Sequence, residues 1–203
     1  MLGLSQILNS LEKCLKKGLS KSPFFLFNKL MKKELRKWAK EKRLTLSVED
    51  CSSQIKNYLF SSEIYKNAKN IMCYYSVGSE VSTVSYFQDE SKNWFMPKVQ
   101  GEEMFVCPYV LPLIDNCYKI PESMSEPVSP KNLDLIIIPA LCVDKNGYRI
   151  GYGKGYYDKF LKGNSRAVRV VVSFDELLVD NVFPDEFDEK VDYVITEKGI
   201  YKI

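Results

Sequence analysis

The most apolar stretch of the chain is LDLIIIPAL, a nearly unbroken hydrophobic run at residues 133–141. A run without regular polar alternation is typical of a central parallel strand that is covered on both faces. AVRVVVSF at 167–174 has the same character and predicts a second central strand. NIMCYYSV at 70–77 and VDYVIT at 191–196 are rich in β-branched and aromatic residues, so they predict two more strands, of which the second is the last of the chain.

A long helix is expected over residues 28–43, because NKLMKKELRKWAKEKR contains no glycine or proline and is full of helix formers. Apolar side chains in and just after this segment can form a buried stripe: Leu35, Trp38, Ala39 and Leu46. Basic side chains at helical spacing share another face: Lys32, Arg36, Lys40 and Arg43. Taken alone, such a basic face is most often a solvated helix surface.

Shorter elements are expected between these segments. Another helix begins after Ser47, with Asp50 three residues later in a weak capping box, and a short helix runs from Ser82 to about Asp89. NWFMPKV and EMFVCPYV predict two strands joined by a QGE turn. Residues 112–132 carry four prolines and are expected to form a long surface loop.

Strands that alternate with helices predict an α/β fold. We expect three αβα layers, with a mostly parallel central sheet and helices on both faces, Rossmann-like although the GxGxxG fingerprint is absent. The length of 203 residues fits a single catalytic domain over 30–203, preceded by an extension over 1–29. The extension has apolar residues at helical spacing, and it is either a mitochondrial-type presequence or a docked extra helix.

The chain contains no histidine. This excludes Ser-His-Asp and Cys-His nucleophile pairs, HExxH zinc sites and histidine proton shuttles. Any chemistry must therefore use carboxylates, Lys or Arg, hydroxyls, backbone amides or a hard metal ion. No apolar run reaches the ~18–20 residues of a membrane span, so no membrane partner is expected.

The cysteines form no CxxC pair, and most have apolar neighbours. This pattern indicates reduced core thiols in a cytosol-like compartment. The six positions are Cys14, Cys51, Cys73, Cys107, Cys117 and Cys142.

The net charge of +3 conceals an asymmetry. Residues 1–46 hold twelve Lys or Arg against three acidic residues, whereas the remainder holds seventeen against twenty-three. The basic segment 1–46 could bind nucleic acid, anionic lipid or a nucleotide phosphate. No aromatic–basic platform or RNA-binding signature accompanies it, so no nucleic-acid partner is expected. A non-catalytic nucleotide- or RNA-binding α/β module is the alternative interpretation.

The sharpest chemical motif is a glycine-rich loop between the expected strand at 133–141 and a helix, YYDKFLKG. Its glycines are spaced GxGxG: Gly151, Gly153 and Gly155. Glycines let the backbone approach a ligand and turn its N–H groups inward, and a helix start adds partial positive charge. Lys154 in the loop and Arg149 at its entrance add full charges, and Asp158 is placed to hold magnesium beside phosphates. A tight connection shaped by glycines is the structural alternative, but the charged residues favour a phosphate site.

The segment PALCVDKNGYRIGYGKGYYDKFL resembles the signature of the 5-formyltetrahydrofolate cyclo-ligases, also called 5,10-methenyltetrahydrofolate synthetases. Other motifs are similar to that family and occur in its order. MKKELRKWAKEKR resembles the N-terminal helix, YYSVGSEVST a strand with its acidic turn, and MPKV followed by IPE the next segments. FDEKVDYVITEKG resembles the last strand. The resemblance covers roughly residues 30–200.

The resemblance implies a set of site residues. The basic helix would contribute Lys32, Lys33 and Arg36 to an ATP site. The loop would wrap the ATP phosphates with Arg149, Gly151, Gly153, Lys154, Gly155, Tyr156 and Tyr157. Folate would be contacted by Tyr75, Glu80, Tyr152, Gly153, Lys154, Gly155 and Tyr156. Asp158 and Asp188 would bind magnesium, and the residues expected to carry the chemistry are Lys154, Arg149 and Tyr156.

The implied reaction is the ATP- and Mg²⁺-dependent cyclisation of 5-formyltetrahydrofolate to 5,10-methenyltetrahydrofolate, with release of ADP and phosphate. It would proceed through phosphorylation of the formyl oxygen, which carries no proton, so the first step needs no strong base. The partners would be these two small molecules. We expect a monomer in the cytoplasm, or in mitochondria if residues 1–29 are a presequence.

Three positions depart from the family pattern. Phe187 stands where many relatives carry histidine, and Val143 stands where an aromatic residue is usual. IPES replaces IPEP, which makes Glu122 a weaker candidate for ligand contact.

Overall fold

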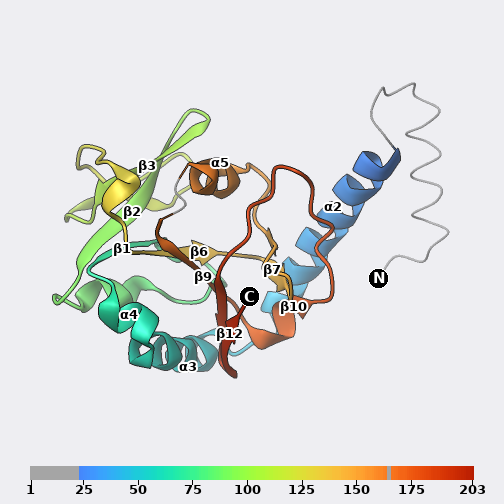
Figure 1. Ribbon diagram of the computed structural model, residues 1–203, viewed down its shortest axis with the longest axis horizontal. Helices are drawn as coiled ribbons and strands as arrows, with labels where there is room; N and C mark the ends of the chain where they lie inside the picture. The colour runs from blue at the N-terminus through green and yellow to red at the C-terminus, as the bar shows by residue number, and fades with distance from the viewer. Residues whose placement is uncertain (1–22, 164–165) are drawn as a thin grey trace.

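The computed structural model describes residues 23–163 and 166–203, and its centre is a seven-stranded sheet (Figure 1). The strands lie side by side in the order β12-β11-β9-β6-β1-β2-β3. Their bounds in chain order are β1 Asn70–Cys73, β2 Asn93–Gln100, β3 Glu103–Pro108, β6 Leu135–Pro139, β9 Val168–Val172, β11 Tyr193–Thr196 and β12 Gly199–Lys202. The inner neighbours pair in parallel, whereas β3 and β12 pair antiparallel at the two edges. The predicted mostly parallel sheet is confirmed.

The order of the parallel strands reverses near the middle of the sheet. β2 lies on one side of β1, while β6, β9 and β11 follow one another on the other side. In sheets of this kind, ligands bind in the crevice outside the carboxyl ends of the two strands at the reversal. Here these strands are β1 and β6, so the topology directs attention to the chain that follows Cys73 and Pro139.

Strand β6 shows why the long apolar run forms a strand without polar alternation. Leu135 and Ile137 belong to the hydrophobic core on one face of the sheet, and Ile136 and Ile138 belong to the core on the other. All four side chains are fully buried. A strand covered on both faces offers no position at which a polar side chain could reach water.

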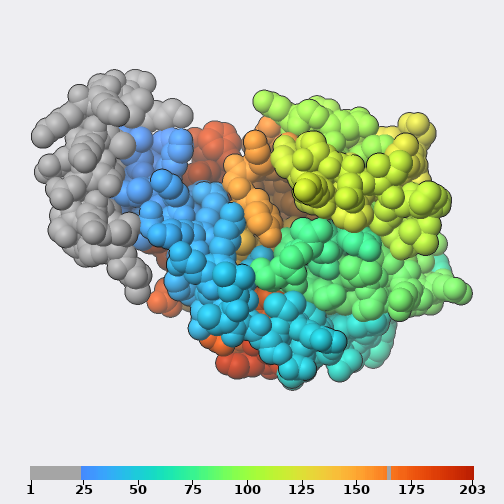
Figure 2. Space-filling model, turned by 180° about the vertical axis from the view of Figure 1, so that it is seen from behind, coloured from blue at the N-terminus to red at the C-terminus, as the bar shows by residue number. Residues whose placement is uncertain are grey.

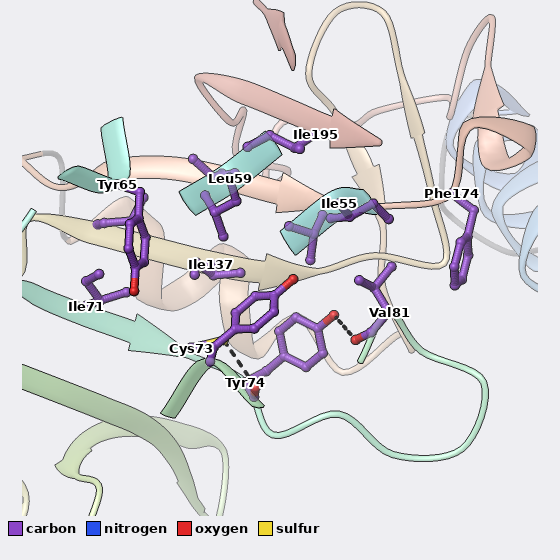
Figure 3. Close-up of a cluster of buried hydrophobic side chains, with 14 of the residues drawn as sticks. Ile55, Leu59, Tyr65, Ile71, Cys73, Tyr74, Val81, Ile137, Phe174 and Ile195 are labelled. Atoms are coloured by element: carbon purple, nitrogen blue, oxygen red, sulfur yellow. Dashed lines mark hydrogen bonds between the residues drawn. The ribbon is translucent and has the colours of Figure 1, made fainter. Parts of the chain in front are cut away.

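The first face is covered by α3 (Val48–Ser61) and α4 (Glu63–Asn67), as Figures 1 and 3 show. Ile55 and Leu59 lie one turn apart on α3 and are fully buried in the same cluster as Ile137 and Ile195. Burying a side chain of this size contributes roughly 1.5–3 kcal/mol. Helix α3 is thus a structural helix whose apolar stripe holds it to the sheet.

The second face is covered by α5 (Tyr156–Lys162), which lies across the sheet from α3 (Figure 1). Its Phe160 and Leu161 are buried in the cluster that contains Ile136 and Ile138. Helices on both faces give the three αβα layers that the sequence predicts, and the fold class is confirmed.

A small three-stranded sheet leads the chain into the glycine loop. Its strands are β7 (Cys142–Asp144), β8 (Arg149–Ile150) and β10 (Leu178–Val179), in the order β10-β7-β8. The β7–β8 turn contains Gly147 at φ +82°, where an added Cβ would lie 2.8 Å from Ile203 Cγ2 and 2.9 Å from the Val191 carbonyl oxygen. Any larger residue would therefore disturb the hairpin that carries the loop.

Helix α2 (Pro23–Arg43) lies at one side of the sheet, beside the small sheet and the connection that precedes β11 (Figure 1). It begins five residues before the expected start at Asn28. Residues 1–22 and Cys14 lie outside the described residues. The expectations of an extension, a presequence or a docked helix therefore stay predictions.

Several local predictions are wrong. Trp38 was expected in a buried stripe but is exposed, whereas Ala39 is fully buried. Ser47 donates to the Asp50 carboxylate and does not cap a helix N–H with its side chain, so no capping box forms. The expected helix from Ser82 is the short 3₁₀ helix η1 (Val84–Gln88). Strand β11 is not the last, because β12 follows it as an antiparallel edge.

The proline-rich segment 112–132 is not a simple loop. It contains the hairpin β4–β5 (Leu113–Asp115 and Pro121–Ser123) and the 3₁₀ helix η2 (Pro130–Asn132). Glu122 fastens this hairpin, because its Oε1 accepts hydrogen bonds from Val99 N at 3.0 Å and Asn116 Nδ2 at 2.8 Å. The remaining 3₁₀ helix is η3 (Asp175–Leu177).

The cysteines of the described residues are all free, as expected. Cys73, Cys107 and Cys142 are buried and Cys51 is partly buried, but Cys117 is exposed on the β4–β5 turn and is not a core thiol.

Candidate functional site

The chain segments that follow β1 and β6 meet at the carboxyl edge of the sheet. After β1 the chain runs through Tyr75 to Glu80, and after β6 it runs through Ala140 and the β7–β8 hairpin to the glycine loop at 151–155. A hydrogen bond of 2.7 Å from the Tyr152 hydroxyl to Glu80 Oε1 joins the two segments. Figure 2 shows the orange surface around residue 150 set back between blue α2 and the green segments. The candidate site therefore lies where the strand order reverses.

The glycine loop has a backbone conformation that favours glycine at two positions. Gly153 has φ +100° and Gly155 has φ +71°, both in the region that favours glycine. An added Cβ at Gly153 would also lie 3.4 Å from Cζ and Nε of Arg36. Arg36 Nε in turn donates to the Gly151 carbonyl oxygen at 3.0 Å. The loop thus rests on the guanidinium of Arg36 in α2, and the positive φ at 153 favours glycine there.

Lys154 stands at the tip of this loop. Its side chain is exposed, and it makes no hydrogen bond or ion pair with any residue of 23–163 or 166–203. An ammonium that no described carboxylate neutralises, carried by a loop of glycines, is suited to meet an anion. This placement leaves the Lys154 side chain available to an anionic ligand, and its role stays a prediction.

Helix α2 turns a polar stripe, not an apolar one, toward this site. Asn28, Lys32 and Arg43 are buried, and Arg36 is partly buried. Asn28 donates to the Pro184 carbonyl at 3.2 Å, and Lys32 donates to Asp185 and Asp188 at 2.7 and 2.5 Å. The expectation of a solvated basic face is wrong for this stripe, whereas Lys33 and Lys40 on its flank are exposed.

Lys32 and Asp188, for which the family resemblance implies ATP and magnesium binding, are brought together as an ion pair. Asp185 joins them, and sequence reasoning missed it. Burial alone would raise the pKa of Asp185, but the hydrogen bond from Lys32 holds that pKa below its ordinary value. The spacing of Asp185 and Asp188, three residues apart in PDEFDEK, is the signal that could have indicated a shared cation.

Arg149 lies behind the loop and does not project from it. Its side chain is 3% exposed, its Nη2 lies 3.1 Å from Asp158 Oδ1, and its Nη1 donates to the Glu189 carbonyl at 3.0 Å. The same Asp158 oxygen accepts from Glu189 N at 3.2 Å. Arg149 therefore fixes the position of Asp158 and of the chain after Asp188.

The donor set fits a magnesium ion that arrives with phosphates. Among the described residues no three His, Cys, Asp or Glu side chains cluster as a ready-made metal site. Mg²⁺ usually binds one or two carboxylates and completes its shell with water and substrate phosphates. Asp158 offers a partly exposed carboxylate whose Oδ2 has no partner in the described part of the chain. Asp188 is partly exposed as well, with its Oδ2 held by Lys32 and Asp185 N.

Glu80 and Tyr152 form the opposite side of the site. Glu80 is 6% exposed, and its Oε2 accepts from Val77 N at 2.9 Å. Partial burial and the negative charge of Glu80 raise the pKa of Tyr152 to about 12, so its hydroxyl stays protonated and donates. Arg43 donates from Nη1 to the same hydroxyl at 3.3 Å. The sequence places Arg43 on the same basic helix face as Lys32 and Arg36, but Arg43 was not expected among the site residues.

The remaining predicted aromatic residues have separate surroundings. Tyr75 is partly buried and stacks on Phe87 with ring centroids 6.0 Å apart. Tyr156 donates to the Gly101 carbonyl at 3.1 Å in the β2–β3 turn. The Tyr157 hydroxyl is buried with no hydrogen-bond partner among residues 23–163 and 166–203, and burial raises its pKa well above the ordinary value. Tyr157 thus packs against the core under α5, with Arg149 5.9 Å from its ring centre, whereas Tyr156 contacts the β2–β3 turn.

Phe187 is exposed on the connection that carries Asp188, and Val143 is fully buried in β7. Two open hollows, each of about 360 Å³, lie instead at the amino ends of the parallel strands, around Asp134 and around Asp192. They are at the edge of the sheet opposite the glycine loop, so they take no part in the candidate site. No helix within the described ranges is long and apolar enough to cross a membrane.

Residues 26–197 match the 5-formyltetrahydrofolate cyclo-ligase family. The 5-formyltetrahydrofolate cyclo-ligase of Mus musculus is 29% identical over 189 residues, which cover 82% of this chain and 93% of that protein. The enzyme of the same name from Haemophilus influenzae is 30% identical over 139 residues, covering 61% and 73%. The solved 5,10-methenyltetrahydrofolate synthetase of Aquifex aeolicus superposes with a TM-score of 0.76 at 31% identity, covering 85% and 92%.

Proposed function

Because this chain belongs to the 5-formyltetrahydrofolate cyclo-ligase family and is a ligase, we propose that it converts 5-formyltetrahydrofolate to 5,10-methenyltetrahydrofolate at the expense of ATP. The products would be ADP, phosphate and the cyclised folate. We further propose a requirement for Mg²⁺.

The observation that carries this proposal is the exposed Lys154 at the reversal of the strand order. It stands on a loop whose positive φ values favour glycine. No carboxylate of the described residues neutralises it. A cation and the backbone amides of a glycine loop at this edge suit a triphosphate, since sheets of this topology bind ligands there. The buried carboxylate of Glu80 faces the same loop through Tyr152 and suits a polar heterocycle.

On the nucleotide side, Lys154 and the amides of Gly151, Gly153 and Gly155 would contact the phosphates. Arg36 would act from below the loop, because it already holds the Gly151 carbonyl. Lys33 is exposed and would add charge at the rim, and Lys32 would reach a phosphate by exchanging one of its two carboxylate partners. Tyr156 and Tyr157 would line the end of the loop.

Asp158 and Asp188 would hold the magnesium ion. When bound, that ion would neutralise oxygens of the transferring phosphoryl group. Arg149 would be a positioning residue here, because its buried side chain is paired with Asp158 and does not reach the loop surface. This assignment replaces the direct phosphate contact that the sequence suggested for it.

On the folate side, Glu80 would bind donor groups of the substrate, and Tyr75, Tyr152 and Tyr156 would border it. Glu80 is anchored by Val77 N through Oε2 and by the Tyr152 hydroxyl through Oε1. Each carboxylate oxygen can accept a second hydrogen bond, so Glu80 can also accept from a substrate N–H while it keeps Tyr152. It would orient the substrate and would not act as a nucleophile.

The proposed chemistry has two steps. The formyl oxygen attacks the γ-phosphorus, the bond from phosphorus to the bridging oxygen breaks, and ADP leaves. Nitrogen-10 then attacks the formyl carbon, the carbon–oxygen bond breaks with loss of phosphate, and the proton of nitrogen-10 is released. Positioning and charge stabilisation supply the catalysis in such transfers, which agrees with a chain that has no histidine.

We also propose a monomeric protein of the cytoplasm that acts on small molecules. The support is that Cys51, Cys73, Cys107, Cys117 and Cys142 are all free thiols, as is usual in a reducing compartment.

Ultraviolet absorbance tests the proposed function directly. The protein is mixed with 5-formyltetrahydrofolate, ATP and Mg²⁺, and the longer-wavelength absorbance of the methenyl product is followed. We expect absorbance to rise only when all three are present. If the complete mixture shows no change while the protein is folded, the proposed activity is wrong.

A further inference from the structure

Arg43, at the end of α2, is buried in the candidate site although the sequence motifs do not mark it. Arg43 is only 4% exposed. Nη2 donates to the carbonyl oxygen of Ala140, the first residue after β6, and Nη1 donates to the Tyr152 hydroxyl at 3.3 Å. The guanidinium thus connects the carboxyl end of a central strand to the glycine loop.

The Tyr152 hydroxyl is shared between two charged groups. It accepts from Arg43 and donates to Glu80 Oε1 at 2.7 Å. Within the described part of the chain, Arg43 and Glu80 form no direct ion pair. The hydroxyl is therefore the link between a buried cation and a buried anion, both of which need a polar partner where water is largely excluded.

The ring of Tyr152 is itself mostly outside the core. The residue is 53% exposed, and Lys40 Nζ lies 5.7 Å from its ring centre. Apolar packing therefore does little to hold this part of the loop, and the hydroxyl contacts with Arg43 and Glu80 must do so. Arg36 holds the neighbouring residue, Gly151, through its carbonyl.

We propose that Arg43 is a positioning residue: through the Tyr152 hydroxyl, and together with Glu80, it fixes the glycine loop in the form that presents Lys154. The effect on loop order is independent of any substrate. Its consequence for turnover rests on the proposed cyclo-ligase activity. The segment held in this way extends from Gly151, tethered by Arg36, to the exposed lysine two residues beyond Tyr152.

Limited digestion with trypsin measures loop order without any substrate. Lys154 is exposed in the loop, and Lys145 is exposed in the β7–β8 turn and serves as the internal reference. We expect Tyr152→Phe to raise cleavage after Lys154 about tenfold relative to Lys145, since a hydrogen bond to a charged group is lost. Arg43→Met should produce a similar rise, and Arg43→Lys a smaller one because an ammonium keeps the charge without the planar fork.

The double variant tests whether Arg43 acts through Tyr152. If it does, Arg43→Met adds less than about twofold in the Tyr152→Phe background. Should Arg43→Met fail to fold, cleavage would rise equally at both lysines, and Tyr152→Phe with Arg43→Lys would still decide. Unchanged cleavage at Lys154 in Tyr152→Phe, or fully multiplicative effects in the double variant, would overturn the proposal.

Turnover provides a second readout, because a purely structural role would not make kcat and loop cleavage change together. We expect kcat for cyclisation to fall about tenfold in Tyr152→Phe and in Arg43→Met, in parallel with loop cleavage. In the double variant, kcat should fall no further. If the unaltered protein does not cyclise 5-formyltetrahydrofolate, the proposed function fails while the trypsin comparison still stands. If kcat is unchanged in a variant whose loop is loosened, the positioning role is wrong.

Discussion

Helices α2 and α3 present opposite kinds of side chain to the rest of the molecule. Helix α3 buries Ile55 and Leu59 against the sheet, with no charged residue among its buried positions. Helix α2 buries Asn28, Lys32 and Arg43 on one face and turns Trp38 outward. The polar groups that α2 buries are held by the glycine loop and by the connection near Asp185. An apolar stripe thus builds the fold, whereas the buried polar stripe builds the site.

The first prediction concerns the charge at the tip of the loop. Lys154→Ala should lower kcat for cyclisation by about 10²–10³-fold, because one preorganised charge is removed from the developing phosphoryl group. The melting temperature should not change, since the side chain is exposed. Steady-state absorbance kinetics and thermal unfolding measure the two effects. A folded variant with full turnover would remove Lys154 from the mechanism.

The matched prediction for α3 concerns its apolar stripe. Leu59→Ala should lower the free energy of unfolding by about 2–5 kcal/mol, the usual cost of a cavity at a fully buried leucine. The kcat of the folded fraction should be unaffected. Urea titration followed by kinetics at low temperature would show this. A loss of kcat at full stability would mean that the division between the two helices is wrong.

A third prediction concerns the metal. Asp158→Asn should raise the Mg²⁺ concentration needed for half-maximal rate by about tenfold, because removing a ligand or its supporting contact costs about that much affinity. Asp115, on the outer hairpin β4–β5, is exposed and provides the control in Asp115→Asn. Titration of the rate with MgCl₂ compares them. Superimposable curves for Asp158→Asn and the unaltered protein would show that Asp158 is not a ligand.

The smallest effect is expected in the acid dependence of the α2 stripe. Asp185 has a folded-state pKa below its ordinary value, so its contribution to stability is present above that ordinary value and is lost as pH falls through the lowered one. Compared with Asp185→Asn, the unaltered protein should be more stable at pH 7, with the difference shrinking below pH 4. Urea unfolding across this range checks the sign. A difference that grows on acidification would contradict the ion pair with Lys32.

The sequence was sufficient for the inner strands of the large sheet, because runs such as LIIIP are apolar throughout and fit only a strand buried on both faces. The sequence also indicated the glycine loop, because positions 153 and 155 have positive φ, which favours glycine. The burial of Lys32 and Arg43 could not be inferred from helical spacing alone, since the partners are 97 or more residues away. The β4–β5 hairpin was missed because its strands are only three residues long and lie among prolines.

The buried position of Arg149 could not be predicted from its place in the sequence either. A basic residue beside a glycine loop suggests a phosphate contact, but in the fold its guanidinium points to Asp158 and Glu189. Local spacing indicates which residues are near the site, whereas tertiary contacts decide which of them face the ligand.

A reactive ATP analogue would show whether the glycine loop binds the ATP phosphates. An acyl phosphate of ATP transfers its acyl group to lysines close to the bound phosphates, and mass spectrometry identifies them. We expect labelling of Lys154, abolished by excess ATP with Mg²⁺. ATP-protected labelling confined to lysines at the opposite edge of the sheet, such as Lys202, with Lys154 unlabelled, would contradict it.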